Sequence, residues 1–290
     1  MLGVCGFMYA LVLIFLIIAV IRARRATGPE MSRDHGLSKT LGLWVALIVV
    51  GLMGLTATSY LIDRQIAQAA NNPDVKLQIT AHQWWWDVEY LDADPSQHFH
   101  TANEIHVPVN SSVHVTLMAD DVIHSFWVPS LHGKRDLIPG RPGSIDLRPE
   151  RVGVYRGQCA EFCGAQHAKM ALEIVVEDAA TFAAWKTKQL ETAPQPRDEH
   201  AARGLDVFMS SACTLCHNIA GTSASATLGP DLTHLASRRM LAAGALPNDR
   251  THLIQWLSDP QSIKPGNHMP SLGLTADALD PLASYLETLR

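Results

Sequence analysis

The sequence predicts a membrane protein of three parts: a pair of spanning helices, an all-β domain and an all-α domain. Two apolar segments occupy most of the first 62 residues, a period-two alternation of apolar and polar residues runs from 75 to 176, and a polar, proline-interrupted linker precedes a helical pattern. The expected parts are residues 1–63, 64–177, 178–199 (a helix and linker) and 200–290. The net charge of −5 and the ordinary composition favour neither nucleic-acid binding nor disorder.

The first part contains two segments that are long enough to cross a bilayer. Leu2–Ile21 carries no charge over 20 residues and as a helix would rise about 30 Å, and Leu41–Ile62 is a second such segment. A signal peptide is the alternative for the first segment, but neither a basic stretch before it nor a small-residue cleavage site after it supports that interpretation. Five basic residues lie between the segments: Arg22, Arg24, Arg25, Arg33 and Lys39. By the positive-inside rule this connection is cytoplasmic, so the rest of the chain lies outside.

The second part has the pattern of short strands. The alternating runs are 75–90, 104–118, 144–155 and 171–176, and turn residues separate them. Strands at this spacing predict an antiparallel sandwich or a small barrel. Loops that are held by such a sheet are where ligands usually lie.

One loop of the second part concentrates metal-binding side chains. Within thirteen residues it carries Cys159, Cys163, His167 and Met170, in the spacing C-x3-C-x3-H-x2-M, and these are the soft and borderline ligands that copper prefers. A disulfide is the alternative, but it would have no use for the histidine and the methionine. A mononuclear blue copper site needs one cysteine and two histidines, whereas two bridging thiolates would hold a pair of coppers. The second histidine must then come from elsewhere, and His124 on a separate loop is the candidate.

The copper pattern, once completed by His124, resembles the binuclear copper (CuA) site of subunit II of the haem-copper cytochrome c oxidases. The resemblance implies a cupredoxin-like Greek-key fold for residues 64–177. It implies the following ligands: Cys159 and Cys163 as bridging thiolates, His124 and His167 as terminal imidazoles, and Met170 and the main-chain oxygen of Glu161 as axial donors. It also implies that the Glu161 carboxylate contacts a magnesium ion at the boundary with subunit I, and a hard oxygen donor suits magnesium.

Trp84, Trp85 and Trp86 follow one another and cannot all face one side of a strand. In one interpretation Trp84 and Trp86 belong to the core and Trp85 is incidental. In the other, the segment resembles the family's W-Y-W region, which implies that Trp84 lies at the surface above the copper pair and receives the incoming electron. Trp85 stands where the family has a tyrosine. The remaining histidines of this part are expected to be surface or strand residues: His98, His100, His106, His114 and His132.

The last part contains a haem-attachment motif. After a helical stretch at 178–190 and the linker, Cys213, Cys216 and His217 form the C-x-x-C-H pattern of c-type haem, in which the cysteines form thioethers and the histidine ligates the iron. A thioredoxin-like pair is the alternative, but the βαβ pattern of that fold does not surround the motif. The expected second axial ligand is Met269, which lies about fifty residues after His217 and is directly followed by a proline. Other candidates for that position are His268, Met209 and Met240.

The surroundings of this motif resemble class I cytochromes c. The segment Gly229–Leu232 is similar to a loop of that family, which implies that the Pro230 carbonyl accepts a hydrogen bond from His217 and fixes its ring. Helical patterns at 202–212, 250–258 and 275–289 would pack around the haem. A domain of about ninety residues is small enough to benefit from a covalent haem as part of its core.

With both motifs on one exported chain, the sequence resembles subunit II of a caa3-type cytochrome c oxidase, with a cytochrome c fused to its C-terminus. The resemblance implies that electrons from an upstream cytochrome or bc1-type complex reach the haem c, pass to the copper pair through the Trp84 region and leave for subunit I, where dioxygen is reduced to water. It implies subunits I and III as partners, and a bacterial inner membrane with the copper and haem domains on its periplasmic side. A short linker gives an effective concentration of order millimolar, so tight docking of the haem domain is not expected.

Two other functions share part of this pattern. A CuA-type nitric oxide reductase subunit would have a similar copper domain, because its distinguishing chemistry lies in the partner. A membrane-anchored copper-delivery protein would use the two cysteines and a distant histidine, but it would require neither Met170 nor a haem domain. One position departs from the family: many members carry a glutamate for proton uptake just before the tryptophan of the second span, but no carboxylate lies just before Trp44. The resemblance therefore does not extend to that route of proton uptake.

Overall fold

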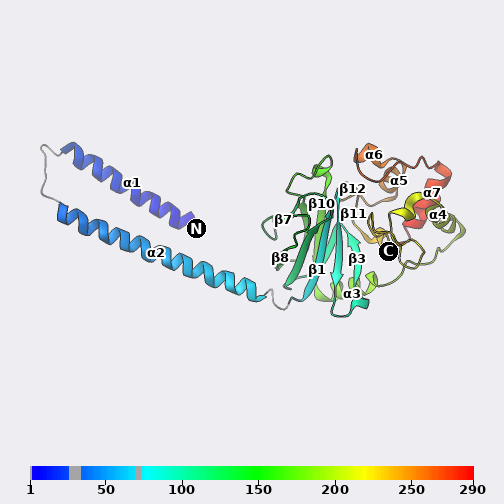
Figure 1. Cartoon of the computed structure of the whole chain (residues 1–290), viewed down its shortest axis with the longest axis horizontal. Coiled ribbons are helices and arrows are strands. Elements are labelled where there is room, and N and C mark those ends of the chain that lie inside the picture. The colour runs from blue at the N-terminus through cyan, green and yellow to red at the C-terminus, as the bar shows by residue number, and fades with distance from the viewer. Residues whose placement is uncertain (1, 26–33, 70–72) are drawn as a thin grey trace. The chain divides into compact units, whose positions relative to one another are not determined.

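The structure is a computed structural model that describes residues 2–25, 34–69 and 73–290. The chain divides into two units, residues 1–64 and 65–290, and each is described by itself. The first unit contains α1 (Leu2–Arg25) and most of α2 (Asp34–Ala69), the two long blue helices of Figure 1.

Both predicted apolar segments are helical. Gly6–Arg25 and Lys39–Arg64 are long and apolar enough to cross a membrane, and the apolar side chains that the structure describes along them are mostly exposed. The rings of Phe15 and Trp44 meet edge-on at 5.7 Å between centroids. Of the basic residues that predict the orientation, Arg33 lies outside the described residues.

The second unit begins with a β domain of two sheets. One sheet has the strand order β3-β2-β1-β5-β8, the other has the order β4-β10-β9, and β6 and β7 form a separate ribbon. The strands are β1 (Val75–His82), β2 (Trp85–Leu91), β3 (Phe99–Ala102), β4 (Glu104–Pro108), β5 (Val113–Ala119), β6 (His124–Phe126), β7 (Arg135–Leu137), β8 (Gly143–Leu147), β9 (Gly153–Gln158) and β10 (Ala171–Glu177). Figure 1 shows them in cyan and green.

Two strand pairs run parallel, which corrects the expectation of an entirely antiparallel sandwich. β1 pairs with β5, and β4 pairs with β10, in parallel register, while the other pairs are antiparallel. The reason is a crossover between the sheets. Asn103, alone between β3 and β4, adopts a left-handed conformation (φ 64°), and its side-chain oxygen accepts a hydrogen bond from the Trp86 N–H at 2.9 Å. The chain leaves the first sheet there and returns to it at β5, on the other side of β1.

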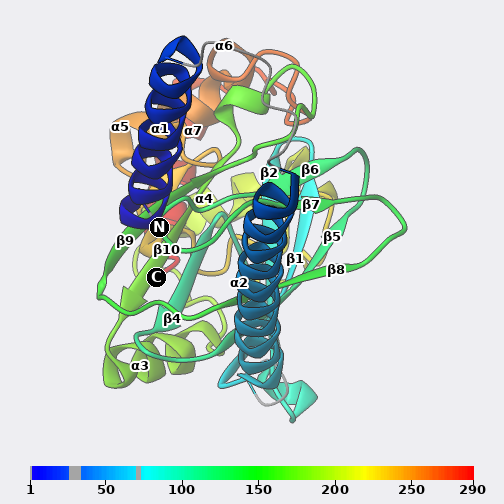
Figure 2. The ribbon, with the colours of Figure 1, turned by 90° about the vertical axis from the view of Figure 1, so that its left-hand side faces the viewer.

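The core lies between the two sheets. Every second residue of β5 is buried, as the period-two pattern predicts. Leu77 and Leu117 from the larger sheet and Leu172 and Ile174 from the smaller one belong to the same buried cluster. Each such side chain contributes about 1.5–3 kcal/mol by its burial. Helix α3 (Ala179–Gln189) follows β10 and packs near β4, as Figure 2 shows.

The remainder of the second unit, termed the cytochrome region (residues 191–290), is mainly helical. Its helices are α4 (Glu199–Ser210), α5 (Arg250–Ser258), α6 (Pro260–Ile263) and α7 (Ala276–Leu286), with a ribbon of β11 (Met240–Leu241) and β12 (Leu246–Pro247). The short 3-10 helices of the unit are η1 (Pro95–Gln97), η2 (His167–Lys169), η3 (Ala212–Leu215) and η4 (Leu235–Ser237). Helices α4 and α7 approach closely at Gly204, where a Cβ atom would lie 2.0 Å from the Pro281 carbonyl oxygen. The ribbon was not predicted, because two-residue strands carry no periodicity.

Candidate metal centre and haem site

The copper-type donors lie on two loops that the sheet brings together. Cys159 directly follows β9 and Met170 directly precedes β10. Because β9 and β10 are hydrogen-bonded neighbours, the loop returns on itself, and the Cys159 N–H donates to the Met170 carbonyl at 2.9 Å. The Ala160 N–H donates to the Ser125 carbonyl at 2.9 Å, which joins this loop to β6, where His124 lies. Main-chain hydrogen bonds therefore hold both ligand loops in place.

The predicted donors gather around two sulfur atoms. The Sγ atoms of Cys159 and Cys163 are 3.7 Å apart, and both thiols are free and buried. His124 Nδ1 is 3.8 Å from the sulfur of Cys159, and His167 Nδ1 is 3.6 Å from that of Cys163. The donor atoms of His124 and the two cysteines all lie within 4.8 Å of one another. The structure therefore has the convergent thiols of a metal site and not the alternative disulfide, whose sulfur atoms would be about 2.05 Å apart.

The two axial donors complete the set. Met170 Sδ lies 3.8 Å from the Cys163 sulfur, and the Glu161 carbonyl oxygen lies 3.2 Å from the Cys159 sulfur. Each sulfur thus has one imidazole and one weaker donor beside it. Two thiolates, two imidazoles, a thioether and a carbonyl, largely shielded from water, fit copper by their softness.

Hydrogen bonds prepare these groups for a metal. The contact between the two sulfur atoms lowers the pKa of the Cys159 thiol and raises that of Cys163, because only one of the two readily carries the negative charge. His124 Nε2 donates to Asp121 Oδ1 at 2.8 Å, which leaves Nδ1 facing the sulfur. Burial raises the pKa of Asp121, but hydrogen bonds from His124 and from main-chain N–H groups outweigh it and keep the carboxylate ionised. Sequence reasoning missed Asp121, although its position three residues before His124 is a local signal.

Trp84 lies beside the copper-type loop but is not at the surface. Its side chain is only 7 % exposed and belongs to the buried cluster of the β domain, as does that of Trp86. The Trp84 indole N–H donates to the Cys163 carbonyl at 2.9 Å. Trp85 is half-buried and stacks on His82 at 4.6 Å. Trp84 and Trp86 therefore belong to the core, as the first interpretation of the three tryptophans expects. Trp84 also contacts the loop of the predicted copper ligands, which the second interpretation requires.

The Glu161 carboxylate points away from this donor set. It is 44 % exposed and forms a 3.7 Å ion pair with Lys134. Of the histidines predicted to be surface or strand residues, four face carboxylates: His98 faces Glu89, His100 faces Asp87, His106 faces Glu104 and Glu177, and His114 faces Asp146.

The haem motif forms a tight turn. Cys213 lies in η3, and its carbonyl accepts hydrogen bonds from the Cys216 and His217 N–H groups at 3.2 and 3.0 Å. His217 Nδ1 lies 2.7 Å from the Pro230 carbonyl oxygen, which is the contact expected from the resemblance. Burial lowers the pKa of His217, which favours the neutral imidazole that ligates iron. A Cβ atom on Gly229 would lie 2.8 Å from His217 Cε1, so the glycine leaves room for the ring.

Met269 lies on a loop after α6 that two side chains hold. Its N–H donates to Asn267 Oδ1 and its carbonyl accepts from Gln261 Nε2, both at 2.8 Å. The competing candidate, His268, is exposed and faces Trp84, with 5.7 Å between ring centroids. Met209 packs against the hydrophobic core of the cytochrome region, and Met240 lies in β11.

A buried nitrogen atom of Arg238 supports a haem in this region. Arg238 Nε and His234 Nδ1 are buried and have no hydrogen-bond partner among the described residues. The other end of the Arg238 guanidinium donates to the Asp231 carbonyl at 2.5 Å. Buried polar groups are normally paired, and a haem carboxylate would supply an acceptor for Arg238 Nε. His234 Nε2 lies 3.1 Å from the Glu191 carbonyl, so His234 Nδ1 is the acceptor nitrogen of a neutral ring. The sequence offered no local signal for these two residues, because their burial is a property of the fold.

Comparisons with known proteins identify the two domains that carry these sites. Residues 75–179 match the family model of the cytochrome c oxidase subunit II periplasmic domain, and residues 201–290 match that of cytochrome c. Cytochrome c oxidase subunit 2 of Alkalihalophilus pseudofirmus is 30% identical over 282 residues, with 95% of this chain and 80% of that protein covered. The same subunit of Bacillus sp. PS3 is 31% identical over 290 residues, with 92% and 80% covered. The periplasmic domain of subunit II of the Bradyrhizobium japonicum cytochrome oxidase is 31% identical, covers 41% of this chain and 96% of its own, and has a TM-score of 0.39.

Proposed function

The chain belongs to the cytochrome c oxidase subunit II family and carries a cytochrome c domain, and from that premise we propose the route by which it passes electrons. Electrons arrive at a covalent haem c, cross to a CuA pair and leave for a haem in subunit I, where dioxygen is reduced to water. The observation that carries this route is the position of Trp84. Its indole N–H bonds to the Cys163 carbonyl on one side, and its ring faces His268, next to Met269, on the other.

The copper pair would supply a one-electron acceptor and donor with little change in geometry. Cys159 and Cys163 would hold it through their thiolates, His124 and His167 through their imidazoles, and Met170 and the Glu161 carbonyl would supply the weaker donors. Because main-chain hydrogen bonds already fix both loops, the ligands need little movement when the charge changes. Asp121 holds the His124 ring in the orientation that presents Nδ1.

The haem would supply the site at which an external electron arrives. Cys213 and Cys216 would attach it, and His217 and Met269 would ligate its iron. Methionine as the second ligand raises the potential relative to a second histidine. Arg238, whose Nε has no partner among the described residues, would donate to a haem carboxylate.

The same premise places the chain in a membrane complex. The basic connection between α1 and α2 is cytoplasmic, so the copper and haem sites lie on the periplasmic side of a bacterial inner membrane. Subunits I and III are the partners, and an upstream cytochrome or bc1-type complex is the donor. The exposed Glu161 carboxylate binds magnesium at the boundary with subunit I, where partner residues complete the ion's ligands.

The function is tested on the co-purified complex. Oxygen consumption driven by a reduced cytochrome is the expected result, and reduction of nitric oxide without oxygen consumption would overturn it. The route is tested by Trp84→Phe, which removes the hydrogen bond to the Cys163 carbonyl. We expect slower transfer from haem to copper in Trp84→Phe and a normal rate in the matched control Trp85→Phe. Equal rates in both variants, with copper intact, would contradict the role of Trp84.

A further inference from the structure

Trp84 is covered by the chain's own cytochrome region. The Lys264 ammonium donates to the Trp84 carbonyl at 2.9 Å and to the Ala242 carbonyl at 3.1 Å. The Lys264 side chain reaches across 180 residues of sequence and is itself buried, at 3 % exposure. The linker alone predicts no such contact, which the structure shows directly.

The segment before Met269 also contacts the copper loop. Gln166 Nε2 donates to the Pro265 carbonyl at 2.6 Å, and Lys169 donates to the Ile263 carbonyl. Gln166 immediately precedes a proposed copper ligand, and Lys169 immediately precedes another. The loops that would carry the copper and haem ligands are therefore joined by hydrogen bonds between neighbours of the ligands.

Lys264 is an unusual residue to bury at this point. Both of its hydrogen-bond acceptors are main-chain carbonyls rather than carboxylates. Burial, and then repulsion from Lys169, lowers the pKa of Lys264 to about 7. A buried cation of this kind adds little net stability, and its best-attested use is to specify one arrangement among several.

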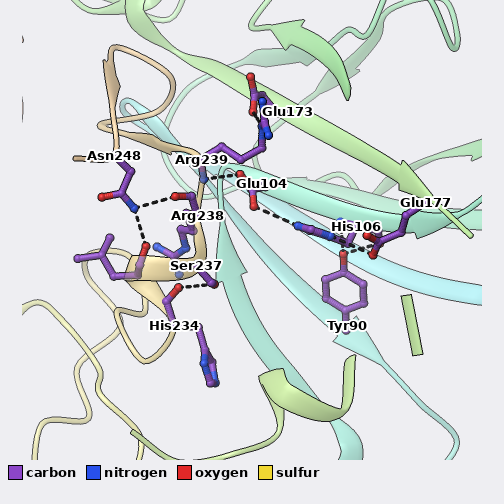
Figure 3. Close-up of polar contacts among 11 residues, drawn as sticks. Tyr90, Glu104, His106, Glu173, Glu177, His234, Ser237, Arg238, Arg239 and Asn248 are labelled. Atoms are coloured by element: carbon purple, nitrogen blue, oxygen red, sulfur yellow. Dashed lines mark hydrogen bonds and ion pairs between the residues drawn. The ribbon is translucent and has the colours of Figure 1, made fainter. Parts of the chain in front are cut away.

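A second polar contact lies at Arg239, and Figure 3 shows it. The Arg239 N–H donates to Glu104 Oε2 at 2.8 Å, and its guanidinium Nε donates to Glu173 Oε2 at 3.1 Å. The other Glu104 oxygen lies 3.0 Å from His106 Nε2, and His106 Nδ1 lies 3.1 Å from Glu177 Oε1. Arg239 thus contacts a carboxylate network that is already ordered on β4 and β10.

A left-handed turn between these contacts reaches the β domain with its main chain. Ala242, Ala243 and Gly244 have φ values of 52°, 58° and 76°, and this region is unfavourable for the two alanines. The Ala243 carbonyl accepts a hydrogen bond from the Ala171 N–H at 2.9 Å. A Cβ atom on Gly244 would lie 2.9 Å from Ala171 Cβ. Such backbone conformations persist only where the surroundings determine them.

We propose that Lys264 and Arg239 are positioning residues that hold the cytochrome region over Trp84, in the arrangement in which the haem of the proposed function can pass its electron to the copper pair. The inference rests on the proposed function. Each transfer oxidises the haem iron by one electron and reduces the copper pair by one, and no bond forms or breaks. The external cytochrome then reduces the haem again. A covered Trp84 excludes that cytochrome from the copper pair.

The test uses the complete oxidase complex with Lys264→Met and Arg239→Gln combined. We expect haem-to-copper transfer to slow by roughly tenfold or more, because Lys264→Met leaves the Trp84 and Ala242 carbonyls without their donor and Arg239→Gln removes the ion pair with Glu173, and both losses lower the docked fraction. Haem and copper spectra and midpoint potentials are expected to stay unchanged. When a reduced external cytochrome is mixed with the wild type, the haem is expected to be reduced before the copper. In the variant, part of the copper is expected to be reduced directly by the external cytochrome, in a kinetic phase that does not involve the haem. The charge-matched control is Lys188→Met with Arg203→Gln, at exposed positions outside these contacts.

A steric variant tests the same contact without changing charge. Gly244→Val would place its side chain against Ala171, whereas Gly273→Val has the same left-handed backbone (φ 63°) and open space around it. We expect slow transfer only in Gly244→Val, and rescue of Arg239→Gln by Arg239→Lys. Normal transfer in the double variant and in Gly244→Val would overturn the inference alone. Failure of electrons to reach copper in the wild type would overturn the proposed function and the inference with it.

Discussion

At the copper site the donor atoms already converge, with four of them within 3.8 Å of one of two sulfur atoms, whereas at the haem site the donors are divided between a tight turn and a distant loop. The copper loops are joined to each other and to β6 by main-chain hydrogen bonds. Buried polar atoms without partners among the described residues lie in both regions: Trp86 Nε1 and Ser125 Oγ in the β domain, and Arg238 Nε and His234 Nδ1 in the haem region. The convergence of the copper donors indicates that the β domain builds its site before the metal arrives, while the separation of the haem donors indicates that the cytochrome region is completed by its cofactor.

The largest expected effect is the loss of the cytochrome fold without haem. Cys213→Ser with Cys216→Ser removes both attachment points, and the region of about ninety residues then lacks much of its core. We expect its cooperative unfolding transition to disappear and protease sensitivity to appear between residues 200 and 290, while the β domain stays resistant. Limited proteolysis with mass spectrometry measures this. Thr214→Ala, inside the same motif, is the control, and a protease-resistant haem-free region would contradict the comparison.

Removal of the copper pair is expected to leave the β domain folded. Cys163→Ser abolishes the binuclear site, but the hydrogen bonds that fix the loops are made by the main chain. We expect the mixed-valence copper signal in electron paramagnetic resonance to vanish, with a stability loss of about 1 kcal/mol, or roughly 4–8 °C in melting temperature. Collapse of the β domain, seen by circular dichroism, would show that the metal and not the sheet organises the loops.

The two sites also differ in how far the sequence predicts them. Cys159, Cys163, His167 and Met170 lie in one short segment, so their chemistry is visible in the spacing, and the strand pattern explains why they share a loop. The parallel pairing of β1 with β5 was missed, because it depends on the crossover at Asn103.

Contacts between distant segments carry no local signal. Lys264 is 180 residues from Trp84 and looks like an ordinary surface lysine in the sequence. Arg238 and His234 likewise become notable only once the fold buries them. Motifs predict the ligands of each site, and the fold alone reveals what surrounds and connects them.

A smaller effect is expected from the residue that orients a copper ligand. Asp121→Ala removes the carboxylate that holds His124 Nε2 at 2.8 Å, and the loss of such a partner weakens metal binding by about 10- to 100-fold. Copper competition with a chelator measures the change. Asp120→Ala is the matched control, since Asp120 is 73 % exposed and faces His82 instead. Unchanged affinity in Asp121→Ala would show that the main chain alone fixes the ring, which would sharpen the comparison further.

The last expected effect is a pH dependence of docking through Lys264. Its pKa is lowered to about 7, chiefly by burial, whereas an exposed lysine titrates near about 10.4. Between these values the undocked state binds a proton that the docked state does not, so docking strengthens as the pH rises, by at most about 1.4 kcal/mol per pH unit. Below pH 7 Lys264 is protonated in both the docked and the undocked state. Docking is then weakest and no longer changes with pH, because the whole free energy of burying the charged amine opposes it.

Carbon-13 NMR of labelled lysine in the purified protein measures this titration directly, with Lys264→Met to assign the signal. The neutral amine still has two hydrogens for the two carbonyls that it contacts, so the hydrogen bonds survive deprotonation. A Lys264 signal that titrates near about 10.4, the value of a lysine in water, would mean that the ammonium reaches water and that the cytochrome region is not held over Trp84. A titration near pH 7 that moves toward that value in Gly244→Val would tie the lowered pKa to docking itself.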